Sequence, residues 1–129
     1  MADSALGHLL KALRVERGLT LREAAQLAEV DHAYVYRLET GARESPSDEV
    51  LMKLARALKA PKRESEMLRY LSAHTETDPE LVAYVRTNPT INYDVFAAAA
   101  SAAFRGTRPD YPKLVGRIRR ILEDEDDGG

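Results

Sequence analysis

The sequence has no cysteine among its 129 residues, which excludes disulfides and cysteine-ligated zinc sites. No apolar run comes near the roughly 18 residues that a membrane-spanning helix needs. The start, MADSALGHLLKALR, lacks the basic beginning and apolar centre of a secretory signal. We therefore expect no membrane association and a cytoplasmic protein, located with the nucleoid when it is bound to DNA.

Motifs for catalysis are also missing. His8, His32 and His74 do not have the spacing of metal ligands, and the sequence contains no glycine-rich phosphate loop. No serine stands in a nucleophile motif. We expect no enzyme activity, no catalytic residue, no cofactor and no metal site.

An excess of positive charge is absent overall, because the formal net charge is −2. This total hides a division along the chain: residues 1–60 are balanced, residues 61–122 carry +3, and the run EDEDD at 123–127 contributes −5. A nucleic-acid binder needs a local basic patch rather than a basic total. We expect 123–129 to be a disordered acidic tail in solvent, with docking on a basic groove as the alternative.

Apolar residues recur at helical spacing along the whole sequence, and no strand pattern of comparable length is present. The sequence therefore predicts an all-α fold. Pro61 and the surrounding break in the pattern indicate a domain boundary near residue 60. We expect a DNA-binding domain at 1–60, a helical dimerisation or partner domain at 61–122, and the tail at 123–129. The predicted helices cover 4–17, 20–28, 31–39, 48–59, 63–73, a segment that opens at Pro79, 92–104, and a segment that opens at Asp110.

The stretch TLREAAQLAEVDHAYVYRLETG, residues 20–41, predicts two short helices joined by a tight turn. Thr20 and Glu23 have the spacing of a capping box, and Asp31 is a good N-cap for the second helix. Gly41 is suited to end that helix in a left-handed conformation. Such a pair can present its second helix, about 31–39, to a DNA major groove.

Within this stretch, Arg37 is the strongest candidate for base readout, since its fork can pair bidentately with guanine. Each of three residues also has an alternative interpretation. Arg37 could form an ion pair with a neighbouring acid, and His32 could be an exposed histidine without a DNA contact. Tyr34 could pack within the protein. Arg22 and Arg43 are expected to hold phosphates. The full set of expected DNA-contacting residues is Thr20, Arg22, His32, Ala33, Tyr36, Arg37 and Arg43.

Across about residues 6–60 the sequence resembles the Xre/lambda-repressor-like helix–turn–helix family. The motifs in register are R-x-x-x-G-L-T, A-x-x-A, V-D, R-L-E-x-G, P-S and L-x-K-L-A-x-A-L. The resemblance implies a five-helix domain and a sequence-specific regulator of double-stranded DNA. It further implies a dimeric repressor on a two-fold symmetric operator with half-sites about one helical turn apart. An antitoxin or adaptor whose C-terminal half binds a protein partner is the alternative.

The resemblance also implies that Arg14, which stands among apolar positions, pairs with Glu39 in a structural ion pair. The chain departs from the family pattern at Leu21, where many members have a glutamine that holds a phosphate or a base-reading neighbour. Arg22 and the first amides of that helix would have to take over this role.

The segment AFRGTRPDYPKLVGRIRRIL is similar, over a shorter length, to the C-terminal part of damage-response repressors controlled by a zinc metallopeptidase. That similarity implies a homodimer formed through the C-terminal helices and a protease-sensitive step at Phe104-Arg105-Gly106. A plain helix end at Gly106 is the alternative. The apolar stripe of the last helix fits either packing within the chain or a dimer interface, and the two are compatible.

Overall fold

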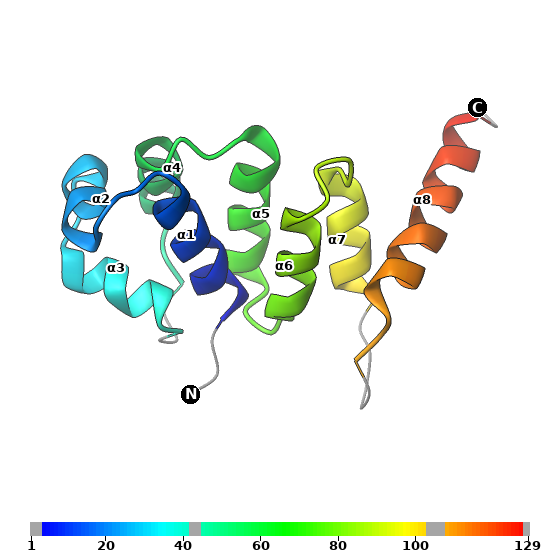
Figure 1. Ribbon diagram of the computed structural model, residues 1–129, viewed down its shortest axis with the longest axis horizontal. Coiled ribbons are helices and arrows are strands. Elements are labelled where there is room, and N and C mark those ends of the chain that lie inside the picture. The colour runs from blue at the N-terminus through cyan, green and yellow to red at the C-terminus, as the bar shows by residue number, and fades with distance from the viewer. Residues whose placement is uncertain (1–3, 42–44, 103–107, 128–129) are drawn as a thin grey trace.

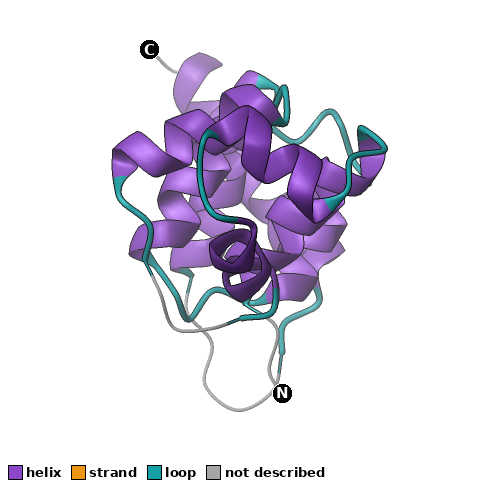
Figure 2. Cartoon of the chain, turned by 90° about the vertical axis from the view of Figure 1, so that its left-hand side faces the viewer, coloured by secondary structure: helices purple, strands orange, loops and turns teal. Residues whose placement is uncertain are grey.

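The computed structural model describes residues 4–41, 45–102 and 108–127, and this part of the chain consists of eight helices and their connections without a strand (Figures 1 and 2). The all-α prediction is confirmed. None of these helices is both long and apolar enough to cross a membrane. The helices are α1 (Ala5–Glu16), α2 (Leu21–Ala28), α3 (His32–Glu39), α4 (Asp48–Ala57), α5 (Lys62–Ala73), α6 (Pro79–Arg86), α7 (Tyr93–Ser101) and α8 (Tyr111–Asp127).

Local sequence signals explain where these helices begin and end. The side chains of Ser4, Thr20, Asp31, Ser47, Asp78 and Asn92 each accept a hydrogen bond from a backbone amide in the first turn of the helix that follows. Such caps satisfy amides that have no partner within the helix. Gly18 and Gly41 have φ angles of 69° and 86°, as expected of residues that follow a helix end.

The hydrophobic core is one cluster to which residues of all eight helices contribute. Helix α1 lies at its centre, with Leu9 and Leu10 fully buried, and it packs against α3, α5 and α6. Helix α4 packs against both α2 and α5. The fifth helix of the expected five-helix unit is therefore α5, which lies beyond residue 60, and the core is continuous across that position. The division of the chain near residue 60 stays a prediction.

Helix α8 stands at one end of the molecule, beside α7 (Figure 1). It buries Val115 but leaves the side chain of Ile121 58% exposed. The acidic run, which we expected to be a disordered tail, continues α8 as far as Asp127. Neither proline nor glycine interrupts the run, so nothing in it forces the helix to end after the apolar stripe.

A buried carboxylate lies at the centre of a network of ion pairs that links α5, α6 and α1. Glu64 of α5 is 2% exposed, and its carboxylate accepts hydrogen bonds from Arg63, at 2.8 Å, and from Arg86 of α6. Arg86 also pairs with Glu16 of α1. Burial lowers the pKa of Arg86. A buried charge is tolerated when it is paired in this way. No local pattern along the chain indicates this network.

The approach to α8 is fixed by Asp78, the N-cap of α6. Its carboxylate accepts hydrogen bonds from Arg108 Nε and from the Tyr111 hydroxyl, both at 2.6 Å, and from the amide of Glu80 at 3.0 Å. Burial of Asp78 acts to raise its pKa, but these hydrogen bonds outweigh burial and leave the pKa lowered. Burial, followed by the neighbouring Asp78, raises the pKa of Tyr111. The start of α8 is thus attached to the start of α6.

Candidate nucleic-acid interface

Helices α2 and α3 form the predicted helix–turn–helix. Thr20 Oγ1 accepts from the amide of Glu23 at 3.1 Å, and Glu23 Oε1 accepts from the amide of Thr20 at 2.9 Å, so the capping box is confirmed. The turn begins at Glu29, whose φ of 58° is left-handed. The amide of Val30 then donates to the carbonyl of Ala25 at 3.0 Å. The short turn lets α3 begin at once, with Asp31 as its cap.

The inner side of α3 is held against α1 and α2. Val35 and Leu38 are 2% and 1% exposed. Helix α1 approaches the end of α3 at Gly7, which has no side chain to keep the two backbones apart. The outer side of α3 is therefore presented by a rigid support, which a base-reading helix needs.

The ion pair between Arg14 and Glu39, implied by the family resemblance, is confirmed. Arg14 Nε and Nη2 donate to the two carboxylate oxygens of Glu39 at 2.7 and 2.9 Å, and Nη1 donates to the carbonyl of Leu19 at 2.8 Å. The hydrogen bond to Glu39 raises the pKa of Arg14. Glu39 has only 5% of its side chain exposed, so its charge is neutralised inside the fold and is not presented to DNA.

The outer side of α3 carries His32, Tyr36 and Arg37, all of which are exposed, Tyr36 by 56%. Ala33, which is also among the expected contacts, is half-buried. Its amide donates to Asp31 Oδ1 at 3.1 Å, which is the N-cap bond of α3. Ala33 can thus contribute less surface to a ligand than its exposed neighbours.

A hollow of about 220 Å³ lies between α2 and the start of α3 and brings Arg22, Gln26 and His32 together. Asp31 also lines it, with Oδ1 3.6 Å from His32 Nδ1. Gln26 was not among the predicted contacts. Its position one helical turn after Arg22 was the available signal, because residues four apart share one side of a helix.

The two aromatic side chains of α3 differ in their surroundings. Tyr34 is half-buried and packs against the core, as the packing alternative predicted. The guanidinium carbon of Arg37 lies 5.6 Å from the centre of the Tyr34 ring, within the range of a cation–π contact. Arg37 is therefore oriented by its own helix before any ligand is bound.

Two predicted features fall in parts of the chain that lie outside the described residues. These are Arg43, expected to hold a phosphate, and the step Phe104-Arg105-Gly106.

Thr20 is exposed at the start of α2, where its hydroxyl already serves as the cap.

The family model for a helix-turn-helix domain matches residues 5–83. The chain is 40% identical over 70 residues to the HTH-type transcriptional repressor RghR of Bacillus subtilis (strain 168), a match that covers 54% of this chain and 50% of that protein. It is 28% identical over 98 residues to the uncharacterized HTH-type transcriptional regulator RghRB of the same organism, covering 76% of this chain and 68% of the relative. The match thus spans about half the length of the first relative.

Among solved structures, the clp gene regulator ClgR from C. glutamicum is similar, with 33% sequence identity and a TM-score of 0.44. The match covers 56% of this chain and 88% of that one. The family match includes α1 to α5 and most of α6, and it contains the capped α2–α3 pair and the Arg14–Glu39 bond. The chain belongs to the helix-turn-helix domain family, as an Xre-like member.

Proposed function

We propose that the chain is a sequence-specific regulator of transcription that binds double-stranded DNA with α3 in the major groove. The observation that carries this proposal is the α2–α3 pair itself: its inner residues and Glu39 are fixed to α1, and its outer side presents His32, Tyr36 and Arg37. A helix presented in this manner fits the width of the major groove.

The contacts divide by role. Arg37 reads a base edge, with His32 and Tyr36 beside it and Ala33 at the periphery. Arg22, Thr20 and the first amides of α2 hold a phosphate, because a helix N-terminus and a guanidinium both favour an anion. Gln26 lies next to Arg22 and His32 in the hollow and can donate to the same phosphate or to a base. Arg43 is assigned to the phosphates of the same strand.

We further propose that the protein acts as a homodimeric repressor, assembled through its C-terminal helices. The exposed Ile121 on α8 supports an interface at that end, and the relative RghR is named a repressor. A two-fold symmetric dimer of such domains reads two half-sites about one helical turn apart. The protease-sensitive step at Phe104-Arg105 remains a separate proposal for its control.

Selection of bound fragments from random double-stranded DNA tests binding, specificity and symmetry together. The proposal expects an enriched inverted repeat, and Arg37→Ala should erase the preference at one position of each half-site. A protein that enriches no sequence at low salt, yet captures a single protein partner in stable complex, would instead be the antitoxin or adaptor. Lys11→Ala, an exposed change on α1, is the matched control and should leave the selected sequence unchanged.

A further inference from the structure

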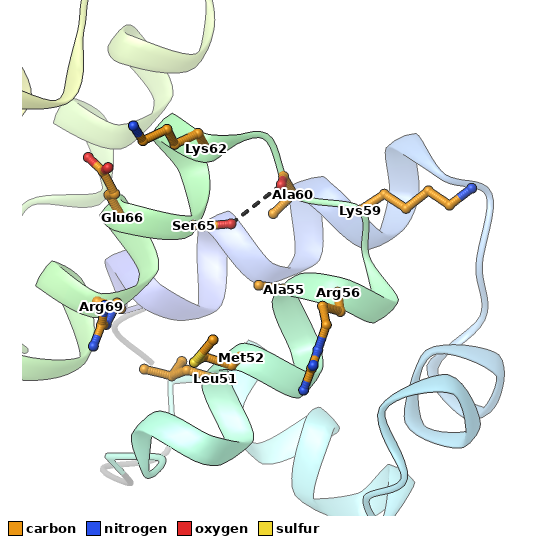
Figure 3. A pocket seen from close by; sticks show the side chains of 10 residues that line it. All are labelled: Leu51, Met52, Ala55, Arg56, Lys59, Ala60, Lys62, Ser65, Glu66 and Arg69. Carbon is orange, nitrogen blue, oxygen red and sulfur yellow. Dashed lines mark hydrogen bonds between the residues drawn. The ribbon is translucent and has the colours of Figure 1, made fainter.

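The structure contains an apolar groove between α4 and α5 that the proposed DNA contacts do not use. Its volume is about 430 Å³, and Leu51, Met52 and Ala55 of α4 form its apolar lining (Figure 3). Met52, which lines the groove, is 52% exposed, so its flexible apolar side chain is accessible to a partner. The groove lies on the part of α4 that faces α5.

The edge of this groove is basic. Arg56, Lys59, Lys62 and Arg69 line it, and Glu66 is the one carboxylate among the lining residues, all of which belong to the described part of the chain. Figure 3 shows the side chains of Lys59 and Lys62 extending away from the central Ser65 rather than towards it. A small anion needs donors that converge. Lysines that point away from each other, as Lys59 and Lys62 do, are better matched to a longer segment with an apolar side and several acids.

The chain itself has one such segment, at the end of α8. Ile121 is 58% exposed and Leu122 is half-buried, and the acidic run of residues 123–127 follows directly. Helix α8 packs against α7, so its end does not lie on the α4–α5 groove of its own chain. Both the exposed Ile121 and the exposed Glu123 that begins the acidic run are therefore available to a second molecule.

We propose that the end of α8 from a second copy of this chain occupies the α4–α5 groove, and that the exchange is reciprocal. Ile121 covers Met52 and Ala55, and the acids of the helix end meet Lys59, Lys62 and Arg56 at the edge. This mode is an amphipathic helix in an apolar groove. It rests on the proposed homodimer and names the surface that the C-terminal helix contacts, which is not a second α8.

The arrangement of the helices allows this exchange. In Figure 1 the connection from α4 to α5 and the C-terminal end of α8 lie along the same long edge of the molecule, well apart from each other. A two-fold axis placed at that edge between them exchanges the two positions. In the proposed dimer each α8 end occupies the groove of the other copy, which gives a closed dimer with two equal contacts.

Zero-length carbodiimide cross-linking of the full chain gives the direct test. Equal amounts of ¹⁵N-labelled and unlabelled protein are mixed, cross-linked and digested, so that mass spectrometry separates links between chains from links within one. The proposal expects mixed-isotope links from Lys59 or Lys62 to a carboxylate of residues 123–127. Mixed-isotope links from that run to Lys113, with none to the groove, would mean an antiparallel α8 pair and would overturn the proposal.

Charge reversal supplies the quantitative test, by analytical ultracentrifugation. Lys62→Glu should weaken the dimer at least tenfold, and adding Glu123→Lys and Glu125→Lys to the same chain should restore it. An acid in the first turn of α5 favours that helix, so the variant is expected to fold. Lys11→Glu, the same reversal on an exposed part of α1, should leave the dimer unchanged.

The outcomes separate this inference from the proposed function. A protein that selects a DNA half-site but stays monomeric at all concentrations overturns the groove contact and leaves DNA recognition standing. A dimer indifferent to Lys62→Glu also overturns it. A dimer with the expected links that selects no DNA sequence supports the groove contact and counts against DNA recognition instead.

Discussion

Gly7 and the carbonyl group of Leu38 are so close that a Cβ atom on Gly7 would lie 2.5 Å from the Leu38 oxygen. It would also lie 2.6 Å from the carbonyl oxygen of Glu39. Only glycine permits this approach. The contact brings α1 against the last turn of α3, and Arg14, two turns along the same side of α1, meets Glu39 there.

Gly7→Ala should destabilise the protein, although alanine is the better helix former. The added methyl group forces α1 and α3 apart, and overpacking of this kind costs about 1–3 kcal/mol. Urea denaturation followed by circular dichroism measures the change. Gly116→Ala on α8 is the matched control: its Cβ meets nothing within 4 Å, so helix propensity should add up to about 1 kcal/mol. Equal effects of the two changes would contradict the steric role of Gly7.

Breaking the Arg14–Glu39 pair should be costly because both side chains are largely buried. Arg14→Met or Glu39→Gln leaves one buried charge without its partner, and losses of about 3–5 kcal/mol are typical of such changes. Urea denaturation of both single variants and the double variant gives the coupling between them. The exposed pair of Lys53 and Glu49, 3.9 Å apart, is the control and should show little coupling. If the double variant lost as much unfolding free energy as the two single variants lose together, the two residues would not be coupled.

Asp78 should make stability depend on pH in the acid range. Its pKa is lowered in the folded state, whereas an unfolded aspartate has a pKa of about 3.9. Folding therefore gains from this carboxylate above about pH 4, and the gain is lost as the pH falls through the folded pKa. Asp78→Asn should destabilise the protein at pH 7, with a smaller difference from the wild type at pH 3.

Unfolding curves of the Asp78→Asn variant at the two pH values measure this change. Asp94→Asn, which removes an exposed carboxylate on α7, controls for the loss of one negative charge. A difference between Asp78→Asn and the wild type that is the same at both pH values would rule out the carboxylate as its source.

Arg37→Ala and Arg22→Ala should weaken DNA binding in different ways. Loss of a bidentate base contact costs about 1–3 kcal/mol on the selected site and little on other sequences. Loss of a phosphate contact weakens binding to every sequence and lowers the slope of log K against log salt by about 1. Titrations on selected and scrambled DNA at several salt concentrations separate the two, and identical behaviour of both variants would refute the assigned roles.

The helix positions and their caps could be predicted from sequence because they depend on near neighbours. Thr20 with Glu23 and Asp31 cap as predicted, and Gly41 is left-handed. These signals act over a few residues and need no knowledge of packing.

Features that depend on contacts between segments far apart in the sequence could not be predicted from local patterns. The need for Gly7 is set by a backbone thirty residues away in sequence. Glu29 is left-handed without the glycine or asparagine that would have marked the turn. The pairing of Glu64 with Arg86 requires knowing that α5 and α6 meet. The Arg14–Glu39 pair is equally remote, but the family resemblance supplied it.

The position of α1 decides how this molecule can be divided. The same helix that supports α3 through Gly7 and Arg14 also packs on α5 and α6 and pairs with Arg86 through Glu16. A chimera that transplants only residues 1–60 into another regulator would expose to solvent the side of α1 that packs on α5 and α6. It would also remove Arg86, the partner of Glu16. We expect the smallest transferable reader of DNA in this chain to extend through α6.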